Sequence, residues 1–171
     1  MQVSRLTRAC SLIASCALIV GCNADFGSGG ASFQNSYSTA RTALETGRYA
    51  RAIQGYSRLM ETAGPFRSRI ELELAHAYLR DGQYAQSAQI ARRVAQSEAG
   101  ENRAAALSVQ ATAEHELGLS ALGAGDVTRG RAFLRQADEA MKTVLDNHAD
   151  MDPLGALAAR RASIAVRLRS L

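Results

Sequence analysis

The chain has 171 residues, which leaves room for one domain and little more. It is 47% hydrophobic with only 5% aromatic residues, and Ala and Leu predominate over the β-branched and aromatic residues typical of sheets. This composition favours an all-α protein. The net charge of +4 falls to +2 if the first 21 residues are removed, since these contain Arg5 and Arg8, and so small a charge argues against a nucleic-acid-binding protein.

Residues 1–21 have the layout of a secretory signal peptide. Two arginines are followed by the apolar run "ACSLIASCALIV" and then by Gly21. The run is too short to span a hydrocarbon layer ~30 Å thick as a permanent helix, so we expect the segment to be removed. Cys10 and Cys16 would leave with it. Cys22 would then be the only thiol of the mature chain, which excludes an internal disulfide or a thiolate metal cluster.

The sequence "IVGC", residues 19–22, resembles the lipobox of bacterial lipoproteins. The resemblance implies that Cys22 becomes the first residue after cleavage, carries a diacylglyceryl thioether on its sulfur and is acylated on its amine. A thiol suits this chemistry because sulfur is more nucleophilic than a hydroxyl, and two or more acyl chains anchor a protein stably where one does not. Asn23 follows, where an Asp would favour retention in the inner membrane. The resemblance therefore implies a lipid-anchored protein of the bacterial cell envelope, in the outer membrane and facing the periplasm.

The next segment, "NADFGSGGASFQ", is rich in small and flexible residues that cannot bury a core. With about 12 links its root-mean-square reach is roughly 20 Å. We therefore divide the chain into a signal peptide at 1–21, a lipidated flexible tether at 22–34 and a helical domain at 35–171.

An internal repeat runs through the helical domain. The sequences "ALETGRYARAIQGY" and "YLRDGQYAQSAQIA" align with Gly47 on Gly82, at an offset of 35 residues. In each, the glycine allows the left-handed backbone that ends one helix, and the Tyr two residues later is expected to pack between the helices. A third, more degenerate block aligns Gly125 with these glycines. The predicted helices lie near 36–46, 49–62, 65–80, 84–98, 101–123, 127–147 and 153–170.

This pattern resembles tetratricopeptide (TPR) repeats over residues 36–148, with Ala52, Ser87 and Gly130 at the small positions where two helices cross. The resemblance implies a right-handed α-solenoid of about three TPR-like helical hairpins; a plain helical bundle is the alternative. A capping helix at 153–170, with Asp152 as its N-cap and Pro153 at its first position, would cover the last repeat. Its apolar stripe is formed by Leu154, Leu157, Ile164, Leu168 and Leu171.

The resemblance also implies a concave groove lined by the first helix of each hairpin. Its apolar floor and arginine rim would suit an extended or helical peptide, whose carboxylates arginine can bind in a bidentate manner. The predicted partner-binding residues are Tyr37, Arg41, Leu44, Arg69, Leu72, His76, Leu79, Arg80, His115 and Leu119.

The sequence contains no recognisable catalytic constellation. His76, His115 and His148 are the only histidines and form no i, i+4 metal-binding pair. No nucleophile elbow occurs, and the glycine-rich "FGSGGAS" lacks the Lys-Ser/Thr of a phosphate-binding loop. We therefore expect neither an enzyme nor a metal, cofactor, nucleic acid or small-molecule substrate.

Together these patterns predict an envelope lipoprotein that acts as a TPR scaffold for a protein or peptide partner, in the assembly of a pilus, secretin, outer-membrane or cell-wall complex. The alternative is a structural or membrane-surface helical lipoprotein without a peptide groove. In that case its basic last helix, with Arg160, Arg161, Arg167 and Arg169, would contact lipid or cell wall.

Overall fold

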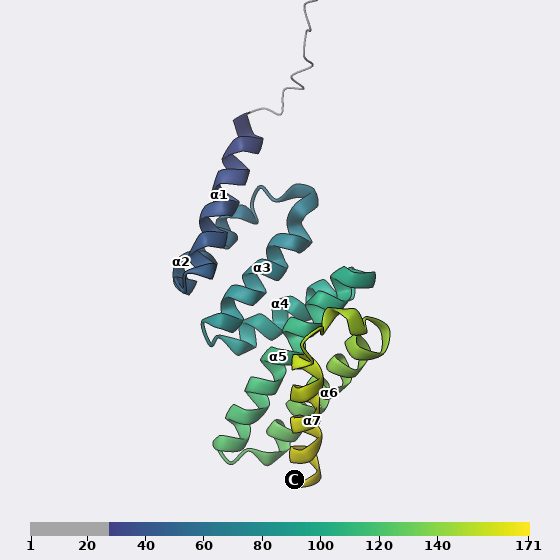
Figure 1. Cartoon of the computed structure of the whole chain (residues 1–171). Coiled ribbons are helices and arrows are strands. Elements are labelled where there is room, and N and C mark those ends of the chain that lie inside the picture. The colour runs from purple at the N-terminus through teal and green to yellow at the C-terminus, as the bar shows by residue number, and fades with distance from the viewer. Residues whose placement is uncertain (1–27) are drawn as a thin grey trace, which may run out of the picture.

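A computed structural model describes residues 28–171, and within this range the protein is all-helical, as predicted (Figure 1). The helices are α1 (Ser28–Glu45), α2 (Tyr49–Leu59), α3 (Arg67–Arg80), α4 (Tyr84–Ser97), α5 (Gly100–Gly123), α6 (Val127–Asn147) and α7 (Ala156–Arg169), with 3₁₀ turns at Gly64–Phe66 and Ala149–Met151. Residues 1–27, with the predicted signal peptide, Cys22 and the first part of the tether, lie outside the described residues.

Each helix packs against the next one in the chain. This holds from α1 and α2 through to α6 and α7, and α3 also contacts α5. Figure 1 shows the result, an elongated row of helices with α1 and α2 at one end and the C-terminus at the other. We call these the α1–α2 end and the α7 end.

Three of the turns share one backbone geometry, and each is built on a glycine. Gly47, Gly82 and Gly125 have φ of 75°, 76° and 82°, a conformation that costs an L-residue energy. Each lies two residues beyond the end of α1, α3 or α5. The amide after each glycine donates to a carbonyl five residues earlier, the hydrogen bond of a Schellman cap. The donor–acceptor distances are 2.8 Å for Arg48 to Ala43, 2.9 Å for Gln83 to Tyr78 and 2.9 Å for Asp126 to Ala121.

Small residues allow the helices of a hairpin to approach closely. A Cβ added at Gly55 in α2 would lie 2.7 Å from the Cβ of Ala40 in α1. A Cβ added at Gly130 in α6 would lie 2.6 Å from Leu122 Cδ2 and 3.2 Å from the carbonyl oxygen of Gly118, both in α5. Gly130 is thus at a helix crossing, as the sequence predicted.

The buried hydrophobic residues form three clusters along the row, and the fully buried aromatic residue is not the one expected from the repeat. Tyr56 is fully buried and belongs to a cluster that joins α1, α2, α3 and α4. Burial raises the pKa of its hydroxyl, which has no hydrogen-bond partner in the described part of the chain. Tyr49 and Tyr84, predicted to pack between the helices, are only half-buried, and of the two Tyr49 packs against this cluster. The hydroxyl of Tyr49 instead accepts a hydrogen bond of 3.0 Å from Arg80 at the rim.

Helix α1 begins at Ser28 rather than at Ser36, so residues 28–34 are helical and not a flexible tether. The physical reason is a tertiary contact. The ring of Phe33 packs against the first core cluster and stacks on Phe66, with centroids 5.9 Å apart. This burial offsets the weak helix propensity of the preceding Ser and Gly residues.

Helix α7 begins at Ala156 rather than at residue 153, because Gly155 has a φ of 68°. Asp152 nevertheless caps it from outside, since its carboxylate accepts hydrogen bonds from the amides of Leu157 (3.0 Å) and Ala158 (2.9 Å). These hydrogen bonds lower the pKa of Asp152, and the bond from the amide of Ala158 has the largest effect. Leu154 was wrongly placed on the apolar stripe: it precedes the helix and is 92% exposed. The other stripe residues pack on the core.

Candidate functional site

The predicted groove arginines are engaged within the protein. Tyr37 and Arg41 of α1 and Arg69 of α3 all donate to one oxygen, Oε1 of Glu73, at 3.2, 3.0 and 3.1 Å. Glu73 is only 6% exposed, so this carboxylate is a buried acceptor shared by two hairpins. Arg41 also donates to Glu45 at 2.6 Å, and these two carboxylates raise the pKa of its guanidinium. This cluster joins α1 to α3. Its tyrosine and arginine donors, which a peptide carboxylate would need, are already bonded to Glu73.

The remaining predicted groove residues do not converge on one surface. Arg80 lies over the ring of Tyr49, 5.5 Å from its centroid. His76 is exposed, and Leu79 and Leu119 are half-buried. Leu44 is buried in the first core cluster, whereas Leu72 packs against the cluster formed by α4 and α5 and lines a small cavity of about 160 Å³.

His115 was also expected in the groove but is buried beneath α7. Arg160 of α7 places Nη1 2.7 Å from His115 Nδ1 and 2.7 Å from Oε1 of Glu116. Because arginine only donates, Nδ1 must accept, and the imidazole is neutral with its proton on Nε2. Burial, followed by the charge of Arg160, lowers the pKa of His115, and this outweighs the opposite effect of Glu116.

A second buried carboxylate lies at the junction of α4 and α5. Glu114 is fully buried, and its Oε1 accepts hydrogen bonds from Arg92 and from Gln110, the latter at 3.0 Å. Glu114 was not among the predicted site residues. The sequence did contain a signal for this ion pair between helices. One predicted helix has an acid within its apolar stripe, and the helix before it carries arginines.

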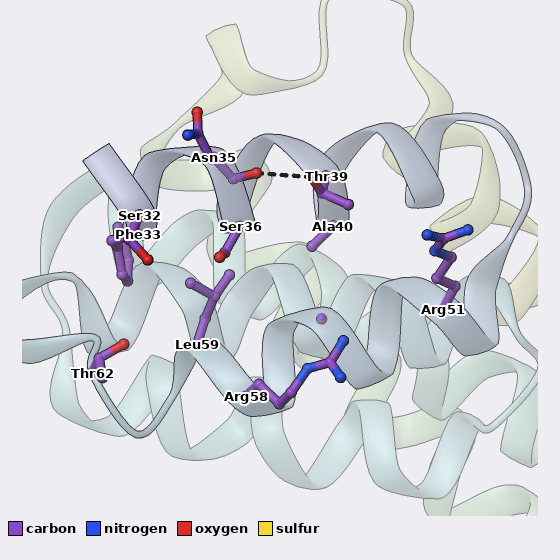
Figure 2. A pocket seen from close by; sticks show the side chains of 11 residues that line it. Ser32, Phe33, Asn35, Ser36, Thr39, Ala40, Arg51, Arg58, Leu59 and Thr62 are labelled. Carbon is purple, nitrogen blue, oxygen red and sulfur yellow. Dashed lines mark hydrogen bonds between the residues drawn. The ribbon is translucent and has the colours of Figure 1, made fainter. Parts of the chain in front are cut away.

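A cavity with a volume of about 680 Å³ lies at the α1–α2 end. It is a groove between the two helices, and Figure 2 shows polar side chains of α1 along one wall and two arginines of α2 along the other. We call it the end groove. Its lining residues are Ser32, Phe33, Asn35, Ser36, Thr39, Ala40, Arg51, Gly55, Arg58, Leu59 and Thr62.

A second, more apolar cavity of about 560 Å³ lies beside it, between α1 and the chain that leads into α3. Phe33 and Thr62 line both cavities. Phe66 borders the second one and is 60% exposed, although it stacks on Phe33. Of the predicted groove residues, only Tyr37 and Arg69 reach this cavity.

Arg51 and Arg58 were not predicted, because binding residues were expected only on the first helix of each hairpin. Both arginines lie on α2, seven residues apart and therefore on the same face. A small residue, Gly55, lies between them. This spacing on an exposed helix face was the available signal.

Other kinds of site are not found in the described part of the chain. None of its helices combines the length and the apolarity needed to cross a bilayer. Within residues 28–171 no group of three or more metal-binding side chains comes together. The two cavities and the arginines that border them are features that suit the binding of another molecule.

Comparison with known proteins finds no matching family model, no matching curated protein and no matching solved structure.

Proposed function

We propose that this protein is a lipid-anchored scaffold of the bacterial cell envelope, which holds a protein partner on a short TPR-like α-solenoid. The observation that carries the proposal is the threefold recurrence of one building block. Each block is a helix, a Schellman turn on a left-handed glycine and a second helix, and each packs on the next. Stacked hairpins of this kind expose long surfaces that serve mainly for protein binding.

The anchor is proposed from the lipobox-like "IVGC" before the helical domain. If Cys22 carries the lipid, six residue steps separate it from the start of α1, which is at most ~20 Å of extended chain. The α1–α2 end would then lie near the membrane surface, and the α7 end would point away from it.

This geometry weighs against the alternative, in which the basic last helix contacts lipid. Two of its four arginines are engaged internally: Arg160 pairs with Glu116, and Arg161 pairs with Asp138 at 3.0 Å. Arg167 and Arg169 lie in the last helical turn, where cations are stabilised by the helix dipole.

The anchor is tested by metabolic labelling with a fatty-acid probe. We expect the wild-type chain and the matched variant Cys16→Ser to be labelled, because Cys16 lies in the segment to be removed, and Cys22→Ser to remain unlabelled. Label retained on Cys22→Ser would refute the anchor.

The scaffold function is tested by affinity purification of the tagged full chain after crosslinking in cells. We expect one or a few envelope proteins to be enriched in the same proportion across replicates. A preparation that retains lipid vesicles but no protein would refute the scaffold and favour the membrane-surface alternative.

A further inference from the structure

The end groove lies on the outer face of the first hairpin. Tyr37 and Arg41 of α1 face α3, where they contact Glu73. At 100° per residue, the groove residues Asn35 and Thr39 point to the opposite side of α1. The same holds for α2, where Tyr56 faces the core and Arg58 lies on the groove side, as Figure 2 shows for Arg51 and Arg58. In the described part of the chain no helix covers this face.

Inside the row, every junction between hairpins has an arginine paired with a carboxylate on the neighbouring helix. Arg41 of α1 pairs with Glu73 of α3, and Arg92 of α4 pairs with Glu114 of α5. At the last junction α7 supplies the arginines, which pair with Glu116 of α5 and Asp138 of α6. At these junctions apolar contacts are thus accompanied by ion pairs, in which a partly exposed arginine reaches a carboxylate that is buried or half-buried.

The end groove contains the arginines of such a junction without the acids. Arg51 and Arg58 are exposed and have no ion-pair or hydrogen-bond partner among residues 28–171. Among residues 28–171, no acidic residue lines the groove. Its floor consists of small and apolar residues, among them Ala40, Gly55 and Leu59. The groove therefore complements a ligand that is apolar in the middle and negatively charged along one edge.

We infer that the end groove binds an amphipathic, acidic α-helix of a partner protein, which stacks on α1 and α2 as one more helix of the row. Apolar side chains of this helix contact the floor, and carboxylates about two turns apart pair with Arg51 and Arg58, whose positions on α2 are separated by roughly 10 Å. The hydroxyl and amide groups of Ser36, Thr39 and Asn35 line the opposite wall. This inference rests on the proposed scaffold function and names its site and its class of partner.

The first test maps the occupant in cells. A photo-crosslinking amino acid replaces Thr39 in the groove of the full chain, and the matched control replaces Ser163, which is exposed on α7. Mass spectrometry then identifies the crosslinked segment. We expect Thr39 to crosslink to an acidic helical segment of another protein, and we expect the charge reversal Arg51→Glu with Arg58→Glu to abolish this adduct. The control reversal, Arg167→Glu with Arg169→Glu, changes the net charge equally and should leave the adduct intact.

The second test measures affinity directly. The probe is a fluorescein-labelled helical peptide of about 15 residues with a Leu/Ala face flanked by Glu, and its counterpart carries Lys in place of Glu. We expect the full chain in detergent to bind the Glu peptide at least roughly tenfold more tightly than the Lys peptide, and we expect the reversal at Arg51 and Arg58 to invert this order. Equal affinities in the wild-type chain would overturn the inference.

The other occupants are separate outcomes of the crosslinking test. An adduct between two copies of this chain, or between Thr39 and residues 22–27 of the same chain, which include Asp25, would overturn the inference. Crosslinks to a partner from other surfaces but not from the groove would overturn the inference and leave the scaffold function standing. No protein adduct from any surface would refute the scaffold function as well.

Discussion

The two ends of this protein are built from the same kind of helix pair but differ in what covers them. At the α7 end, Ile164 of α7 is fully buried in a cluster with residues of α5 and α6. Its arginines Arg160 and Arg161 pair with acids of the helices below. At the α1–α2 end no described helix covers the hairpin, and Arg51 and Arg58 border an open groove.

The role of an arginine here depends on whether its side chain faces a packed neighbouring helix. Where two helices pack, as α7 does on α5 and α6, guanidinium and carboxylate are brought together, and the pair helps to position the helix. At an open end the same side chain is solvated and contributes little to folding. The open end therefore presents two arginines without an internal partner among residues 28–171, whereas the α7 end pairs Arg160 and Arg161 with acids.

The largest effect on stability should come from weakening the packing of α7 on the helices below it. Ile164→Ala removes a fully buried side chain, and we expect it to lower the free energy of unfolding by ~2–5 kcal/mol, measured by chemical denaturation. The matched control is Val166→Ala on the same helix, which is 60% exposed and should change stability by less than ~0.5 kcal/mol. Equal effects of the two substitutions would mean that α7 does not pack as a cover.

A somewhat smaller effect is expected at the helix crossing beneath the open groove. Gly55→Ala would place a Cβ 2.7 Å from the Cβ of Ala40, so α1 and α2 must move apart. We expect a loss of ~1–3 kcal/mol in the free energy of unfolding. Gly123→Ala in α5 is the control, because no atom lies within 4 Å of the added Cβ, and it should stabilise by up to ~1 kcal/mol. A neutral Gly55→Ala would show that this end is loosely packed.

The arginines of the two ends offer a direct contrast. Arg160→Ala removes donors to His115 and Glu116, and we expect it to cost ~1–2 kcal/mol, below the upper range for charged hydrogen bonds because Arg160 and Glu116 are 34% and 29% exposed. Arg58→Ala should change stability by less than ~0.5 kcal/mol. Thermal and chemical unfolding of both variants measure the difference, and a destabilised Arg58→Ala would reveal a partner for this arginine within the chain.

The helical class and the turns could be predicted from the sequence because they depend on local chemistry. Gly47, Gly82 and Gly125 stand where only glycine adopts the backbone of a Schellman turn at low cost, so their recurrence located the end of three helices. The start of α1 could not be predicted in this way. Its first residues have weak helix propensity, and the contact between Phe33 and Phe66 is formed only when distant parts of the chain pack together.

The binding surface was predicted less well, because ion pairs between helices depend on tertiary packing. Arg69 and Glu73 are four residues apart on one helix, and this pair was visible in the sequence. Arg41 reaches the same carboxylate from 32 residues away, and nothing local indicates it. The groove arginines chosen from the repeat pattern were therefore those with internal partners, while Arg51 and Arg58, which border the end groove, were overlooked.

The smallest expected effect is a pH dependence that belongs to the α7 end. Burial and the charge of Arg160 lower the pKa of His115 in the folded protein, whereas in the unfolded chain it is close to the ordinary value of about 6.5. The unfolded state therefore binds more protons as the pH falls below that value, and the folded state loses stability progressively until the pH passes the folded pKa. We expect the melting temperature to decrease between pH 7.5 and 5.5.

The variant His115→Gln isolates this contribution from that of His76, whose pKa is also lowered by partial burial. Its amide oxygen accepts a hydrogen bond from Arg160 as Nδ1 does, but it does not titrate. The melting temperature of the variant should therefore vary less with pH than that of the wild-type chain, and the two curves should converge at neutral pH. If the melting temperatures of the two proteins varied with pH in parallel, protonation of His115 would not destabilise the folded state. This would require that α7 leaves the imidazole of His115 exposed to water. The α7 end would then be no more closed than the α1–α2 end, and the contrast between them would have to rest on packing alone.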